Sequence, residues 1–197
     1  MGHTISTSNY YLAIALQDII KELRCGQNIC IIDLNCCLCL NDLFDIVSQC
    51  SNDGALIYLI GGQGIYSELL GCFDVIDMNE SINAIQMFIR RRKGVSPVQL
   101  NRYIVSCLAL DKLSKSQIHI SILSGKMKIS SVGEVVNLSV ASVHNQIRIS
   151  ARKMNFSSLL RFRYFISKEF SSRGNNGRGI LLDSSLRSRS GGLLYQR

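Results

Sequence analysis

The chain has 197 residues, of which 47% are hydrophobic, and a formal net charge of +8 at pH 7. This length allows two small domains, and the hydrophobic fraction supports buried cores. A membrane-spanning helix is excluded because no run of about 18 uncharged apolar residues is present. The first residues also lack the basic and apolar segments of a secretory signal, so we expect a soluble, cytoplasmic protein.

Charge is distributed unevenly along the chain. Residues 1–110 contain seven Lys/Arg and ten Asp/Glu, whereas residues 111–197 contain fifteen Lys/Arg and four Asp/Glu. A mildly acidic part is therefore followed by a strongly basic one. A basic surface attracts nucleic-acid phosphates, although a solvated basic surface or an RNA-binding tail remains an alternative on charge alone.

The cysteines all lie in the acidic part. They are Cys25, Cys30, Cys36, Cys37, Cys39, Cys50, Cys72 and Cys107. Without an export signal we expect reduced thiols that act as small buried apolar groups. The group Cys36, Cys37 and Cys39 lacks the paired spacing of a zinc site and has no histidine nearby, so we expect no metal and no other cofactor.

The sequence of residues 1–93 predicts alternating helices and strands. We expect helices at 10–23, 41–50, 65–70 and 80–92, and strands at 29–32, 55–60 and 73–76. The run Ile29-Cys30-Ile31-Ile32 is continuous and apolar, which is typical of a strand buried on both faces. This alternation with short loops predicts an α/β domain built on a parallel sheet.

The rest of the chain reads as helical. Residues 94–111, which include the only proline, Pro97, are expected to form a linker with a helix near 99–108. Residues 112–170 are expected to form an all-α domain with helices at 115–124, 130–136, 139–154 and 157–170. The Ser-, Arg- and Gly-rich segment 171–197 cannot bury enough apolar surface to fold, so we expect a disordered basic tail.

The segment from Ser131 to Val143 carries the pattern of a helix-turn-helix. Asn137-Leu138 supplies the turn, Ser139 caps the second helix, and the small Gly133 lets the two helices approach closely. The apolar positions that would wedge the helices together are Val132, Val136, Leu138 and Val143. A small helical bundle without DNA-binding function remains the alternative.

This pattern resembles the helix-turn-helix of LuxR-type transcription regulators. The family's Leu/Ile-Ser and Thr-Val pairs match Leu138-Ser139 and Ser142-Val143, and the resemblance extends over about sixty residues, from Leu113-Ser114 to beyond Arg152-Lys153-Met154. The chain departs from the family pattern in three places. Gln117 replaces the usual Glu, Gly125 comes early and predicts an irregular first turn, and Ser150 stands where an apolar residue is common.

The resemblance implies specific contacts with double-stranded DNA. His144, Asn145 and Arg148 fall on base-facing positions of the second helix, where Asn can recognise adenine and Arg can recognise guanine. The positions expected to hold phosphates are Ser139, Ser142, Arg152 and Lys153.

The amino-terminal part resembles a reduced receiver domain. Asp33 falls on the phosphoacceptor position, but Thr7 and Ser8 replace the acidic pair that binds Mg²⁺. The positions of the conserved hydroxyl residue and lysine fall on Gly61 and Met78. Only about four residues separate the first helix from the strand at Ile29, so one βα unit is missing. A lone carboxylate binds Mg²⁺ poorly, so we expect a phosphorylation-independent pseudo-receiver used for protein contacts.

A degenerate receiver joined to this helix-turn-helix resembles the enterobacterial auxiliary regulators of the RcsA, BglJ and FimW kind. The resemblance implies a regulator, for instance of fimbrial genes, that acts as a homodimer or pairs with another regulator. Segments 82–89 and 157–170 carry surplus apolar residues for such contacts. The alternative is an antiactivator that contacts another regulator without binding DNA. An enzyme is not expected, because His3, His119 and His144 lie outside any catalytic constellation.

Overall fold

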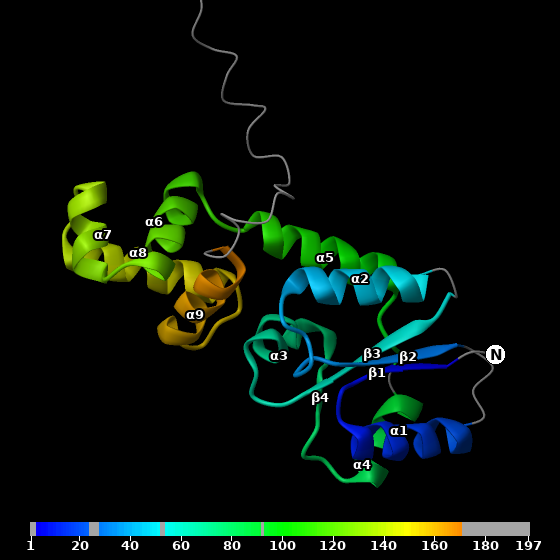
Figure 1. The fold of residues 1–197 in the computed structure, drawn as a ribbon. Coiled ribbons are helices and arrows are strands. Elements are labelled where there is room, and N and C mark those ends of the chain that lie inside the picture. The colour runs from blue at the N-terminus through cyan, green and yellow to red at the C-terminus, as the bar shows by residue number, and fades with distance from the viewer. Residues whose placement is uncertain (1–2, 24–27, 52–53, 92, 171–197) are drawn as a thin grey trace, which may run out of the picture.

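The computed structural model describes residues 3–23, 28–51, 54–91 and 93–170 (Figure 1). The tail 171–197, for which the sequence predicts disorder, lies outside the described residues. A four-stranded sheet with helices on both faces is followed by a group of helices. None of the described helices is long and apolar enough to cross a membrane.

All four strands of the sheet run parallel. They are β1 (Thr4–Ser6), β2 (Ile29–Asp33), β3 (Leu56–Gly61) and β4 (Ile76–Asp77), and they lie side by side in the order β1-β2-β3-β4. The sequence did not predict β1, because a three-residue strand leaves almost no pattern. The strand expected at 73–76 is wrong in position. A 3₁₀ turn (η1, Gly71–Phe73) occupies its start, and Asp74 has a left-handed backbone (φ 54°) that an extended strand does not allow.

Helices cover both faces of the sheet. On one face, α1 (Tyr10–Leu23) and α4 (Ile82–Arg91) pack on the side chains of Ile31 and Ile60. On the other face, α2 (Leu40–Ser51) and the short α3 (Ile65–Leu69) pack on the side chains of Ile32 and Leu59. Alternate side chains of β2 and β3 therefore belong to two separate apolar layers, one on each face of the sheet. Because both faces are buried, these strands have no polar face.

The placement of α1 gives the sheet an unusual connection. The strand order advances in one direction from β1 to β4, yet α1 crosses on the face opposite to α2 and α3. The β1-α1-β2 crossover therefore has the opposite hand to the next two, although such crossovers are almost always right-handed. Removing the second βα unit from a sheet of order 2-1-3-4-5 leaves this arrangement, because the first helix keeps its face and then leads directly to the former third strand.

The segment after α4 is held against the sheet. Val95 and Ile57 exchange two backbone hydrogen bonds of 2.8 and 2.9 Å in an antiparallel bridge beside β3. A Cβ atom at Gly94 would lie 2.9 Å from the carbonyl oxygen of Ile57, so only glycine fits there. Ser96 then caps α5 (Pro97–Ala109), which runs along α2 (Figure 1).

In the described part of the chain, four further helices follow α5. They are α6 (Lys115–Lys126), α7 (Ile129–Val136), α8 (Val140–Lys153) and α9 (Leu159–Phe170), each within two residues of the expected bounds. Gly125 lies inside α6 and does not interrupt it. A Cβ atom at this glycine would lie 2.9 Å from Cγ2 of Ile166, so Gly125 allows a close contact between α6 and α9. The turn to α7 comes after it, at Met127, whose backbone is extended (φ −141°).

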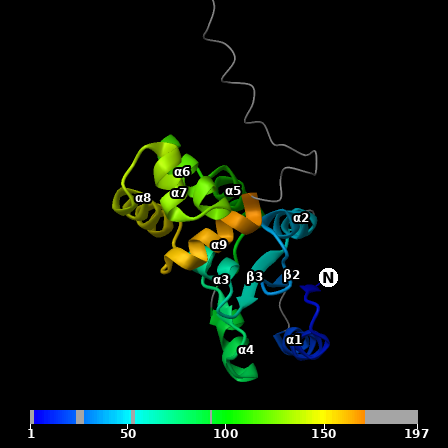
Figure 2. The ribbon, with the colours of Figure 1, turned by 60° about the vertical axis from the view of Figure 1, so that its left-hand side comes forward.

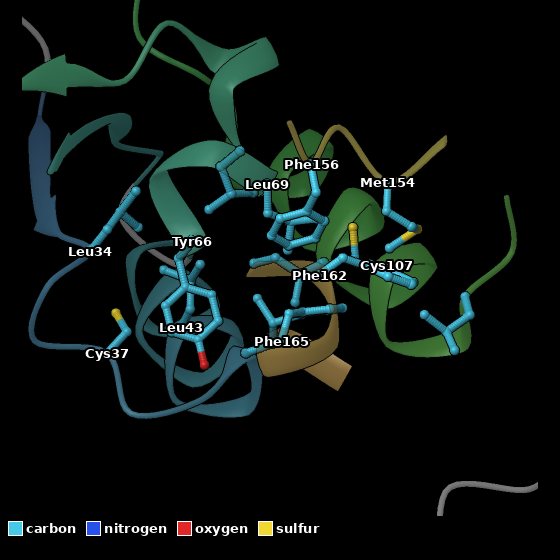
Figure 3. Close-up of a cluster of buried hydrophobic side chains, with 14 of the residues drawn as sticks. Leu34, Cys37, Leu43, Tyr66, Leu69, Cys107, Met154, Phe156, Phe162 and Phe165 are labelled. Atoms are coloured by element: carbon cyan, nitrogen blue, oxygen red, sulfur yellow. The ribbon is translucent and has the colours of Figure 1, made fainter. Parts of the chain in front are cut away.

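The helical part shares a buried core with the sheet. Tyr66 and Leu69 of α3 lie beside Phe156, Phe162 and Phe165, as Figure 3 shows. In this way α9 lies between α3 and the helices α6 and α8 (Figure 2). At the edge of this contact, Glu68 accepts hydrogen bonds from Ser157 and pairs with Arg161 at 3.3 Å. The face of α8 that turns away from this core remains exposed.

Candidate nucleic-acid interface

The turn between α7 and α8 is fixed by backbone contacts. Asn137 ends α7 in the left-handed region (φ 54°), a conformation that asparagine tolerates better than most residues. The amide of Leu138 donates to the carbonyl of Gly133 at 2.9 Å, and a Cβ atom at Gly133 would lie 2.7 Å from the carbonyl oxygen of Leu138. Ser139 caps α8 by accepting a 3.1 Å hydrogen bond from the amide of Ser142. The angle between the two helices is therefore set locally.

One face of α8 belongs to the core. Val143, Ile147 and Ala151 recur every four residues and are buried. Ser150 is also buried, and its hydroxyl donates to the carbonyl of Gln146 at 2.8 Å, so a polar residue is accommodated at a position where an apolar one is common. Leu138 differs from the expectation that it wedges the helices together, because its side chain is 41% exposed.

The opposite face of α8 carries the predicted base-facing residues. His144, Asn145 and Arg148 are all exposed, and Arg152 continues the same stripe one turn after Arg148. Within the part of the chain that the structure describes, none of the side chains of His144, Asn145 and Arg148 forms a hydrogen bond or an ion pair. These groups are available to a ligand.

The predicted phosphate-binding residues lie at both ends of α8. Ser139 and Ser142 are exposed at its start, where their hydroxyl oxygens lie 2.8 Å apart. Arg152 and Lys153 are exposed in its last turn. The structure thus brings all seven sequence-predicted contact residues onto one helix and its cap.

Charge around α8 is strongly positive. Residues 112–170 contain ten Lys/Arg and two acidic residues, Glu134 and Glu169. Glu169 is buried against α3, so Glu134 is the exposed acid among the described residues of this part. Such a surface attracts polyanions at long range.

Sequence reasoning missed the contacts that Gln117 makes with α8. The side chain of Gln117 hydrogen-bonds Lys153 at 3.0 Å and Gln146 at 3.4 Å. The signal was its place in the first turn of α6, where it also completes a capping box with Ser114.

A second polar cluster lies at the carboxyl ends of the strands, where Asp33 ends β2. The Asp33 carboxylate is 3% exposed and accepts hydrogen bonds from the Thr7 hydroxyl (2.8 Å), the Asn35 amide (2.9 Å) and the Cys36 thiol (3.2 Å). Both carboxylate oxygens are therefore occupied by neutral groups of the chain itself.

Neutral groups also take the other receiver positions. The Cys36 sulfur accepts a hydrogen bond from the Ser8 amide at 3.1 Å, so a thiol lies between Asp33 and the pair Thr7 and Ser8. Met78 contacts the Asn35 side chain through its sulfur at 2.9 Å. Next to Cys36, burial raises the pKa of the Cys37 thiol to about 12, which keeps it protonated. No group of three or more His, Cys, Asp or Glu side chains among the described residues is arranged to hold a metal ion.

Comparison of the sequence with protein-family models and with curated proteins gives no match. Solved structures with a similar fold include two of the response regulator RcsB. One is the two-component response regulator RcsB in complex with DNA, with a TM-score of 0.57, 10% identity and coverage of 85% of this chain and 98% of that chain. The other is RcsB from Salmonella enterica serovar Typhimurium bound to promoter P1flhDC with phosphomimetic BeF3-, with a TM-score of 0.56, 12% identity and the same coverage. The predicted fold class, a receiver-like parallel sheet followed by a helical domain, is confirmed.

Proposed function

We propose that this chain is a sequence-specific DNA-binding transcription regulator whose α8 enters the major groove. The observation that carries the proposal is the exposed stripe of His144, Asn145, Arg148 and Arg152 on a helix that the turn at Asn137 fixes at its start. A major groove admits one α-helix, and exposed amide and guanidinium groups supply donors for base edges.

Each residue has a distinct role in this proposal. Asn145 and Arg148 recognise bases, with His144 beside them, and these contacts determine which sequence is bound. Ser139, Ser142, Arg152 and Lys153 hold phosphates and fix the register of α8 on the duplex. The domain assignment follows: 112–170 is the DNA-binding unit, 1–93 the receiver-like unit, and 94–111 the connection between them.

The fold similarity supports this proposal, because both RcsB structures are described as DNA complexes. The motif that ends in Ser142-Val143 supports membership of the LuxR type. A transcription regulator acts where its DNA is, so we propose a cytoplasmic, nucleoid-associated protein without enzymatic activity.

DNA binding is tested by selecting duplexes from a random pool with the full chain and titrating the enriched duplex across a range of salt concentrations. We expect specific binding whose affinity falls steeply as salt rises, since Lys and Arg contacts release counterions. If the protein is instead an antiactivator, it should not bind DNA even at low salt. A variant that lacks a remote exposed charge, Lys21→Ala on α1, should bind as the original chain does.

Control of this protein, we propose, does not depend on phosphorylation. Both oxygens of Asp33 are already hydrogen-bonded within the chain, and Thr7 and Ser8 supply no carboxylate for Mg²⁺. Incubation with a small phosphodonor and Mg²⁺ should leave the intact mass unchanged, as in an Asp33→Asn control. Stoichiometric phosphorylation of Asp33 would refute the proposal.

Pairing with a second regulator or a second copy is the control that we propose instead. The apolar side chains of α4 are only partly used inside the fold: Ile85 and Ile89 are buried, whereas Ile82 and Met87 are exposed. On α9, Leu160 and Tyr164 are exposed, whereas Phe162, Phe165 and Ile166 lie in the core. The resemblance to fimbrial regulators suggests fimbrial genes, repressed or adjusted, as targets. Mass measurement in solution, with and without Ile82→Ser and Met87→Ser, tests α4 as the contact surface.

A further inference from the structure

Gln117 connects the first helix of the DNA-binding unit to the end of α8. Its side-chain oxygen accepts hydrogen bonds from the Ser114 amide (3.2 Å) and the Lys153 ammonium (3.0 Å). Its side-chain nitrogen donates to the Gln146 oxygen at 3.4 Å. These three contacts fix the orientation of the amide group, which is 7% exposed.

Because the Gln117 amide is neutral, it does not offset the positive charge of Lys153. A capping box accepts Glu as readily as Gln at this position. A carboxylate there would lie within hydrogen-bonding distance of the Lys153 ammonium and would offset its charge. Gln117 instead holds the ammonium by a charge-assisted hydrogen bond and leaves its charge intact. Among the described residues, Lys153 forms no ion pair with a carboxylate.

We propose that Gln117 is a positioning residue that holds Lys153 in place for a DNA phosphate and preserves its full positive charge for that contact. The inference rests on the proposed DNA-binding function. It assigns a role to a residue that touches no DNA itself. Lys153 lies at the end of α8, next to Arg152. With α8 in the major groove, a lysine at this position would contact the DNA phosphates that border the groove.

Three variants of the full chain test this role: Gln117→Glu, Lys153→Met and the double variant. The probe is a labelled duplex of random sequence, and the readout is the slope of the logarithm of affinity against the logarithm of salt concentration. We expect Gln117→Glu to reduce the slope by about one and to weaken binding about fivefold at physiological salt, since one phosphate contact is lost. The melting temperature should change little, because the capping box is kept and the Gln146 side-chain amide can turn its nitrogen towards the new carboxylate.

The double variant separates an effect through Lys153 from a direct effect of the new carboxylate on DNA. If Gln117 acts through Lys153, Lys153→Met alone lowers the slope equally and adding Gln117→Glu lowers it no further. An unchanged slope in Gln117→Glu overturns the inference but leaves DNA binding standing. A full additional loss in the Lys153→Met background also overturns it. Absence of salt-dependent binding by the unmodified chain overturns the proposed function and this inference together.

Discussion

The hydroxyl of Tyr66 on α3 donates a 2.6 Å hydrogen bond to the buried carboxylate of Glu169 on α9. The same carboxylate oxygen accepts a 3.0 Å hydrogen bond from the amide of Leu40 at the start of α2. Burial, and then the hydrogen bond to Glu169, raise the pKa of Tyr66 above its usual range, so the phenol remains a donor at neutral pH. This contact fixes α9 to α2 and α3, the helices that cover one face of the sheet, and with it the orientation in which α8 is presented.

Replacing Glu169 tests how much this buried contact stabilises the fold. Glu169→Ala leaves the Tyr66 hydroxyl and the Leu40 amide without this acceptor, and we expect the free energy of unfolding in urea to fall by about 1–3 kcal/mol. Glu169→Gln keeps an acceptor oxygen and should lose clearly less. Equal losses in both variants would show that the carboxylate charge, rather than hydrogen bonding, matters.

Alkaline pH should destabilise the protein through its buried thiols. Burial raises the pKa of the Cys107 thiol to about 12, despite the nearby Lys112, whereas an unfolded cysteine titrates near 8.5. Between these values the unfolded chain gives up a proton that the folded chain retains. The stabilisation is therefore complete below about pH 8.5 and declines as pH rises towards 12.

The measurement is urea unfolding of the original chain and of Cys107→Ser, whose hydroxyl does not titrate in this range. We expect the stability difference between them to change in favour of the variant by on the order of 2 kcal/mol from about pH 8.5 to about pH 10. A difference independent of pH would mean that Cys107 ionises equally in both states.

The helix-turn-helix should not tolerate a side chain at Gly133. A Cβ atom there would lie 2.7 Å from the Leu138 carbonyl oxygen, so Gly133→Ala must push α7 and α8 apart. We expect a loss of about 1–3 kcal/mol in the free energy of unfolding, together with weaker DNA binding. Gly71→Ala is the matched control, since nothing lies within 4 Å of its Cβ position. Tolerance of Gly133→Ala would contradict the close approach.

Most helices and strands could be predicted because their caps and apolar patterns lie within the element itself. The cap at Ser139, the four-residue spacing of Val143, Ile147 and Ala151, and the apolar run at β2 each depend on neighbours in the chain. The strand β1 was not predicted, because its three residues form a strand only through their pairing with β2. Leu138 was misplaced because the family pattern fixes the turn but not its exposure.

Contacts between the two parts of the chain could not be predicted in this way. Tyr66 and Glu169 lie 103 positions apart, and nothing near either residue indicates the other. The same holds for the Cys36 thiol, which approaches Ser8 from 28 positions away. The sequence identified Asp33 and the missing acidic partners, but only the fold shows that neutral groups of the chain occupy the carboxylate.

Recognition of DNA bases by α8 is tested most directly by the ratio of affinities for the selected duplex and for random duplex, measured at one salt concentration for the original chain and for Arg148→Ala. If Arg148 recognises guanine, the substitution should lower this ratio by a factor that corresponds to about 1–3 kcal/mol, while binding to random duplex and the melting temperature change little. An unchanged ratio, or equal loss on both duplexes, would contradict base recognition by this face of α8.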